Sequence, residues 1–298
     1  MNLQSIINGP LGVGTALFLS RAIPPKFGYA LGSRLAGLLA RRDTPMAQAV
    51  RRNQWVVSGG RLTSAELDRA VLSTFQSTAH CLYDLYHYMH NPQAAARLVR
   101  TSPSTLEFIR SGQEQPGGKV LVGLHMSNFD FAMQAAAGWG LKALAITLPE
   151  LGPGYKWQYD LRRKAGLDIR PASINLFREA VRHLRAGGMV LTGIDRPQEN
   201  SKYRVQFFRH PAALPVFHIQ LALKADAPVY IAAAVLQPDG IYEINITGPI
   251  HMQPYPDRHA ELVRNAEAVL AAAEEIICQA PHQWAMFYPV WPEVLIPQ

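Results

Sequence analysis

The chain has 298 residues, of which 48% are hydrophobic, so it is long enough to bury a large core in one α/β domain or two small ones. Its formal charge is +7, but the basic residues are not interleaved with aromatic ones in a nucleic-acid-binding pattern, so nucleic acid is not an expected partner. Two cysteines, Cys81 and Cys278, are too few and too far apart for a disulfide framework or a metal cluster, which indicates a reducing compartment.

The first 42 residues combine basic and apolar character. They contain five basic residues and no acidic one, and their apolar runs are shorter than the roughly 20 residues that cross a bilayer. We therefore expect residues 1–42 to form interfacial helices on a membrane surface with anionic lipid. A signal peptide is an alternative, although the basic residues follow the first apolar run, and two ordinary surface helices are another. The basic residues are Arg21, Lys26, Arg34, Arg41 and Arg42.

Helix signals follow. Thr44 and Pro45 are typical of an N-cap and a first-turn proline, and Gly59-Gly60 can end the helix that they begin. The sequence Thr63-Ser-Ala-Glu66 is a capping box that opens a long helix through Met89. No Ser/Gly-rich or charged linker interrupts the chain, so we expect residues 43–298 to be one domain that folds together with the N-terminal segment.

From Lys119 onward, strand-like and helix-like segments alternate. This pattern predicts an α/β fold, a single-domain mixed sheet flanked by helices and preceded by the helical N-terminal segment. The expected strands lie near residues 119–124, 142–147, 189–194, 228–235 and 241–247, and the expected helices near 128–138, 155–166, 174–186, 214–225 and 257–278.

The segment from His125 to Asp130 lies at a strand-to-helix turn. Asp130 falls in the first helical turn, where the backbone N–H groups stabilise a carboxylate. A carboxylate that binds one imidazole nitrogen leaves the other free to take a proton, so we interpret His125 as a general base and Asp130 as its orienting acid. The sequence contains no Gly-x-Ser-x-Gly or His-Glu-x-x-His motif, which favours activation of a substrate hydroxyl. A chance His–Asp spacing is the alternative.

Polar residues follow three of the expected strands. They are His125, the segment 147–150 that ends in Glu150, and the pair Asp195-Arg196. Ligands of open α/β sheets bind outside the carboxyl ends of the strands, so we expect these three ends to converge on one site.

Taken together, these motifs give the chain a resemblance to the lysophospholipid acyltransferase superfamily. Within it, the chain is similar to the bacterial group of lipid A lauroyl/myristoyl and phosphatidylinositol mannoside acyltransferases, and Glu150 with Asp195-Arg196 looks more like the mannoside branch. The resemblance covers roughly residues 20 to 295. The matching segments are His125 to Asp130, Arg162-Arg-Lys-Ala-Gly166, Leu184 to Val190, Asp195, Val205-Gln-Phe-Phe208 and Pro281-His-Gln-Trp284.

This resemblance implies transfer of a fatty acyl group from the thioester of acyl-CoA or acyl carrier protein to a hydroxyl of a membrane glycolipid or lysophospholipid. It implies no cofactor and no metal, and a peripheral position on the cytoplasmic face of the inner membrane. Glu150 is expected to support the imidazole or hold a sugar hydroxyl, Arg162 and Arg163 to bind phosphate, and Asp195 and Arg196 to shape the acceptor pocket or contact the headgroup.

Several alternatives remain open at this point. Glu150 as a solvated loop carboxylate and Arg162-Arg163 as a basic helix face are the plainer interpretations of those residues. A catalytically silent lipid-binding protein and a hydrolase are rival functions. The helix that carries His80, Asp84 and His87 suggests packing rather than a metal site. Arg209, His210 and His218 depart from the family pattern beside the expected acceptor site, so the identity of the acceptor is not determined by the sequence. The acyl chain length depends on how a hydrophobic groove is packed, and neither it nor the acyl carrier can be read from the sequence.

Overall fold

A computed structural model describes residues 20, 22–88, 91–111, 117–147, 163 and 167–296. Glu150, Arg162 and the helix expected near 155–166, apart from Arg163, therefore lie outside the described residues. Within the described part of the chain, no helix is both long and apolar enough to cross a membrane.

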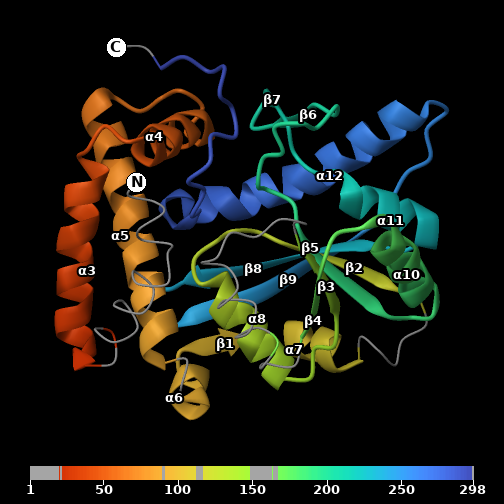
Figure 1. Cartoon of the computed structure of the whole chain (residues 1–298), viewed down its shortest axis with the longest axis horizontal. Coiled ribbons are helices and arrows are strands. Elements are labelled where there is room, and N and C mark those ends of the chain that lie inside the picture. The colour runs from red at the N-terminus through yellow and green to blue at the C-terminus, as the bar shows by residue number, and fades with distance from the viewer. Residues whose placement is uncertain are drawn as a thin grey trace.

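A seven-stranded mixed sheet forms the centre of the molecule, with strand order β1-β9-β8-β2-β5-β3-β4 (Figure 1). Strand β9 pairs antiparallel with β8, and all other neighbours are parallel. The carboxyl ends of β2, β5 and β3 therefore meet at one edge. The strands are β1 (Val99–Thr101), β2 (Lys119–Gly123), β3 (Leu144–Thr147), β4 (Asp168–Pro171), β5 (Met189–Gly193), β8 (Val229–Leu236) and β9 (Tyr242–Ile250).

Helices cover both faces of this sheet and bury a separate apolar core on each. One core joins the sheet to α10 (Ile174–Arg185), α11 (Phe217–Ala225) and α12 (Arg258–Gln279). The other joins it to α7 (Pro103–Ser111) and α8 (Phe129–Gly138). Successive residues of β2 and β5 alternate between the two cores, as expected for strands covered on both faces.

The N-terminal helices stand together at one end of the molecule, where α3 (Pro25–Ala40) and α4 (Pro45–Val57) lie beside α5 (Ser64–Tyr88) (Figure 1). Thr44 caps α4 through its side chain, and Thr63 and Glu66 form the expected capping box at α5. Smaller elements are α6 (Pro92–Ala96), the hairpin of β6 (Val205–Phe207) and β7 (His210–Ala212), and the 3-10 helix η1 (Pro281–Gln283).

These elements confirm the expected α/β fold and its N-terminal helices. The five expected strands appear as β2, β3, β5, β8 and β9, each within a few residues of its expected position. The pattern missed β1, β4 and the β6–β7 hairpin, which have three or four residues each, as well as α7. Such short strands contain too few alternations to be read from hydrophobic periodicity.

Candidate active site

Two neighbouring parallel strands bring His125 and Asp195 together. In the register between β2 and β5, Gly123 is paired with Gly193, and each of the two side chains comes two residues later in its chain. Because β2 and β5 run parallel, His125 and Asp195 leave the sheet next to each other. The convergence expected at the ends of these strands is therefore confirmed for His125 and Asp195.

The carboxylate of Asp195 holds His125 through two contacts, one to the imidazole and one to the backbone. Its Nδ1 lies 2.6 Å from Asp195 Oδ1, and its backbone N–H donates to Oδ2 at 2.8 Å. Oδ2 also accepts a hydrogen bond of 2.9 Å from the indole Nε1 of Trp284. The Asp195 side chain is fully buried, whereas that of His125 keeps 30% of its surface exposed.

The electrostatics of this pair fit a base with a fixed orientation. Burial acts to raise the pKa of Asp195, but the charge of His125 and the hydrogen bonds from His125 and Trp284 outweigh it and hold the pKa below its ordinary value. Asp195 is therefore a carboxylate at neutral pH, and Nδ1 of a neutral imidazole must carry the proton that it shares. Nε2, which has no hydrogen-bond partner among the described residues, is left to accept a proton.

The C-terminal segment fixes the loop that carries His125. Met126 and Trp284 form an isolated antiparallel bridge, and Ala285 donates its backbone N–H to the carbonyl of His125 at 2.8 Å. Ser127, whose φ of 48° is unusual for a residue other than glycine, donates its N–H to the carbonyl of Gln283 at 2.7 Å. The block Pro281–Trp284 thus supports the geometry of His125, a role that the sequence did not reveal.

The contact expected for Asp130 belongs to Asp195 in the structure. Asp130 lies in the first turn of α8 as expected and is only 5% exposed. The pKa of the nearby Tyr86 phenol is raised to about 12, mainly by burial and in smaller part by the charge of Asp130. The carboxylate on Nδ1 of His125 is nevertheless that of Asp195. The assignment of the Nδ1 contact to Asp130 is therefore corrected, and a catalytic part for Asp130 stays a prediction.

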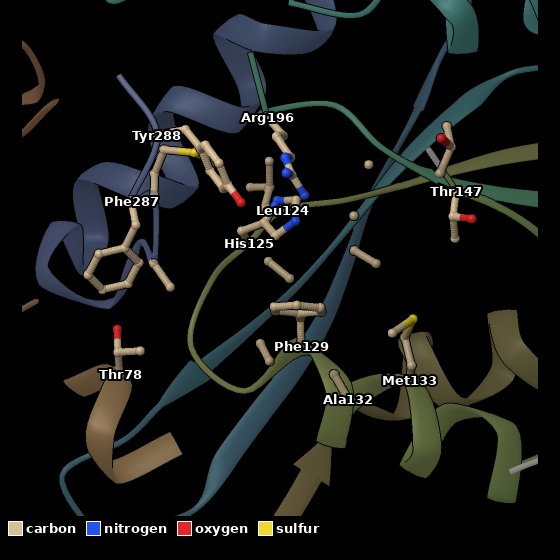
Figure 2. Close-up of a pocket in the computed structure, with 18 of the residues that line it drawn as sticks. Thr78, Leu124, His125, Phe129, Ala132, Met133, Thr147, Arg196, Phe287 and Tyr288 are labelled. Atoms are coloured by element: carbon tan, nitrogen blue, oxygen red, sulfur yellow. The ribbon is translucent and has the colours of Figure 1, made fainter. Parts of the chain in front are cut away.

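The other expected site residues have different surroundings. Arg196 lies beside His125, and its guanidinium is stacked 4.1 Å above the ring of Tyr288 (Figure 2). Arg163 is exposed and donates to the backbone carbonyl of Ile169 at 3.3 Å. Asp195 is buried against His125 and Trp284 with both oxygens engaged, so it is not available for the headgroup contact that was one of its expected roles.

A cavity of about 1350 Å³ surrounds His125. Figure 2 shows His125 with Arg196 and Tyr288 on one side and Phe129 on the other; Phe129 meets the imidazole edge-to-face with ring centroids 5.1 Å apart. Part of the cavity is an apolar chamber between α8 and the sheet. A second part borders α3 and α5, and a third is polar. The polar part is lined by Arg196, Gln198, Asn200, Ser201 and Lys202.

The residues that depart from the family pattern lie away from this cavity. Arg209 is in the tight turn of the β6–β7 hairpin and has a φ of 61°. Among the described residues, none between Tyr203 and Pro215 lines the cavity, so Arg209 and His210 are not part of its wall. His218 is buried in α11, and burial lowers its pKa to about 3. His218 therefore carries no charge at neutral pH, and neither Arg209 nor His210 is among the described residues that line the cavity.

The helix with His80 and His87 takes part in a polar network that joins three elements. The buried carboxylate of Asp84 accepts hydrogen bonds of 2.6 Å from the phenols of Tyr29 in α3 and Tyr242 in β9. It also lies 3.2 Å from Nε2 of His80. Among the described residues, no group of three or more His, Cys, Asp or Glu side chains is placed to hold a metal ion.

A search among curated proteins finds no significant match. The family model for bacterial lipid A biosynthesis acyltransferases matches residues 8–293, which is nearly the whole chain. The chain therefore belongs to the bacterial lipid A biosynthesis acyltransferase family and is an acyltransferase.

Proposed function

We propose that the protein transfers a fatty acyl group from a thioester, acyl-CoA or acyl carrier protein, to a hydroxyl of a membrane glycolipid of the lipid A precursor type, with His125 as the base. The observation that carries this proposal is the His125–Asp195 pair, which faces an apolar cavity large enough for an alkyl chain. Phosphatidylinositol mannoside and lysophospholipid acceptors offer the same hydroxyl chemistry and are outcomes of the test below.

The proposed reaction uses His125 twice. Nε2 takes the proton of the acceptor hydroxyl while its oxygen attacks the thioester carbonyl carbon and a tetrahedral oxyanion forms. When this intermediate collapses, the C–S bond breaks, the new ester remains on the acceptor, and the leaving thiolate takes the proton from His125. Asp195 stabilises the imidazolium between these steps because its carboxylate faces Nδ1.

Cations at the polar side of the cavity suit the anionic parts of both substrates. We assign Arg196 to the oxyanion or to a phosphate, because its guanidinium lies beside the base and is oriented by Tyr288. Lys202, which is exposed at the same side, suits a phosphate of the acceptor or of the donor's carrier. Glu150 and Arg162 keep their proposed roles with the sugar hydroxyl and the phosphate.

A membrane-facing surface on α3 would supply the lipid substrates. Four large apolar side chains of this helix are exposed, and Leu31 and Leu35 among them also line the cavity. The surface thus borders the cavity that leads to His125. Exposed basic residues on and beside the helix complement anionic lipid. The apolar residues are Phe27 (66% exposed), Leu31 (40%), Leu35 (52%) and Leu38 (61%).

The experiment that tests this function compares purified wild-type protein with the His125→Ala variant. Acyl transfer from dodecanoyl-CoA and from dodecanoyl acyl carrier protein is followed by mass spectrometry, with lipid A precursor, phosphatidylinositol mannoside and lysophospholipid offered as acceptors. Loss of the base should lower turnover by about 10²–10⁴-fold. Near-normal transfer by the variant would contradict the proposed base, and the absence of transfer to any acceptor by the wild type would favour a lipid-binding protein without chemistry.

A further inference from the structure

Two glycines lie side by side directly beneath the candidate base. Gly123 ends β2, Gly193 ends β5, and the two are paired in the sheet register. Gly123 and Gly193 each lie two residues after Leu121 and Leu191, whose side chains belong to the core on the α8 face of the sheet, so both glycines are on this same face. The side-chain layer of this face therefore has a gap two residues wide where the strands reach His125 and Asp195.

The backbone does not require glycine at either position. Neither residue is among those with positive φ, so both have a conformation that any L-amino acid adopts. Glycine in a strand costs conformational entropy and offers no side chain for packing, and it often marks a place where a ligand approaches closely. Another property of these two positions must therefore account for the glycines.

Open space distinguishes this pair from a packing glycine. A Cβ at Gly123 would meet no heavy atom within 4 Å, and a Cβ at Gly193 would meet Cε1 of His125 at 3.6 Å, which is an ordinary van der Waals contact. At Gly118, by contrast, a Cβ would lie 2.2 Å from the backbone oxygen of Leu184. Gly118 is needed for close packing, whereas Gly123 and Gly193 face the cavity.

The chamber above this gap has apolar walls. Ala132, Met133 and Ala136 line it from α8, and these residues lie progressively farther along the helix from Phe129, which touches His125. From Phe129 to Ala136 the helix rises by about 10 Å. The sheet side is mainly apolar, with Thr147 at the end of β3 as a polar exception, so the chamber suits an alkyl chain. Its lining from the sheet includes Leu121, Ala145, Ile169, Leu191 and Ala232.

We propose that Gly123 and Gly193 form the passage by which the acyl chain of the donor enters the chamber between α8 and the sheet, and that their lack of side chains lets the enzyme accept long-chain donors. This proposal rests on the proposed function, because it takes the thioester carbonyl to lie at Nε2 of His125. With the carbonyl there, the first methylene groups of the chain pass over the glycine pair. A side chain at Gly123 would fill the space that those methylene groups occupy.

The test uses the full-length variants Gly123→Ala and Gly123→Val, with Gly138→Ala as the matched control. Gly138 ends α8, a Cβ there also meets nothing within 4 Å, and the residue is outside the cavity lining. The readout is the ratio of kcat/KM for dodecanoyl-CoA to that for butyryl-CoA, because this ratio cancels a general loss of active protein. Gly123→Val should lower the ratio about tenfold or more, Gly123→Ala should lower it less, and Gly138→Ala should leave it at the wild-type value.

Binding of a non-reactive ligand separates this inference from the proposed function. The thioether analogue of dodecanoyl-CoA, measured by calorimetry, should bind Gly123→Val about tenfold more weakly than the wild type even if no acceptor is ever acylated. Thermal melting checks folding, and Gly123→Ala should melt at or above the wild-type temperature because alanine suits a strand better than glycine. An unchanged ratio and unchanged thioether affinity in folded Gly123→Ala and Gly123→Val would overturn the passage, as would an equal change in Gly138→Ala.

Discussion

At the scale of single residues, substitution of the two acids Asp195 and Asp130 should distinguish their roles. Asp195→Asn should lower kcat by about 10²-fold or more, because an amide can stabilise the wrong tautomer of His125 and cannot balance the imidazolium. Asp130→Asn should cost less, since Nδ1 of His125 is already bound by Asp195. Steady-state transfer kinetics on both purified variants provide the comparison, and a larger loss in Asp130→Asn than in Asp195→Asn would reverse this assignment.

The carboxylate partner of His125 illustrates what local sequence can and cannot reveal. The spacing of His125 and Asp130 pointed to His125 as the candidate base and to the turn on which it lies, because both are local features. The carboxylate on its imidazole comes from Asp195, 70 residues away, and depends on β2 and β5 being neighbours in the sheet. The order of strands in a sheet is not a local property, so the sequence pattern placed Asp195 at a strand end but did not pair it with His125.

Trp284 should act on catalysis through Asp195. Trp284→Phe keeps an aromatic ring in the core but removes the N–H that Oδ2 of Asp195 accepts. A hydrogen bond to a charged group contributes about 1.5–3 kcal/mol, so we expect kcat to fall roughly tenfold. The loss of this donor should also raise the pKa of Asp195. Because protonation of this carboxylate would remove the charge that balances the imidazolium, the acid limb of the pH–rate profile should move to higher pH.

A second tryptophan in the same cluster provides the control for this prediction. Trp291 is fully buried, and its Nε1 has no hydrogen-bond partner in the described structure. Trp291→Phe removes the same atoms from the same core without removing a contact to Asp195. If it changes the pH–rate profile as much as Trp284→Phe does, the effect of Trp284 is packing alone.

At the scale of elements, the sequence predicted helix starts most accurately, because the hydrogen bonds that cap a helix involve only a few neighbouring residues. The Thr44 cap and the capping box of Thr63 and Glu66 are present as expected, because each depends on side chains within one helical turn. The hairpin of β6 and β7 was missed because its turn, at Phe208 and Arg209, uses positive φ without glycine or asparagine.

The apolar surface of α3 leads to a prediction at this scale. Leu35→Asn combined with Leu38→Asn should weaken flotation of the protein with anionic liposomes, because both side chains are exposed and apolar next to exposed Arg34 and Arg41. Ile174→Asn is the control, since Ile174 is an exposed apolar residue, 76% accessible, on α10. Equal binding by the α3 variant and the control would exclude this surface as the membrane contact.

At the scale of the whole molecule, folding stability at mildly acidic pH should depend on a residue outside the candidate site. His218 is buried in the core that joins the sheet to α10, α11 and α12, and neither ring nitrogen has a partner in the described part of the chain. Burial lowers its pKa to about 3, against an ordinary value of about 6.5. Between these two values the unfolded chain binds a proton that the folded protein does not.

The sign of the effect follows from this difference in bound protons. Because the unfolded state binds more protons in this window, the free energy of unfolding should decrease as the pH falls from about 6.5, by up to about 1.4 kcal/mol per pH unit from His218. Burial also lowers the pKa of His282, which adds a contribution of the same sign. The lowered pKa of Asp195 contributes stability that is lost only at lower pH, below the ordinary range of a carboxyl group.

Replacing His218 should therefore flatten the dependence of stability on pH. His218→Leu removes the buried group that resists protonation and leaves no unpaired ring nitrogen in the core, so its free energy of unfolding should vary less between pH 7 and pH 5 than that of the wild type. Urea unfolding at pH 7, 6 and 5 measures this slope, and replacement of the exposed His251 by Gln controls for the loss of a histidine as such. A histidine that burial keeps neutral must contribute to this slope. If the free energy of unfolding of His218→Leu depends on pH as strongly as that of the wild type, other groups govern acid unfolding and the assignment to His218 is wrong.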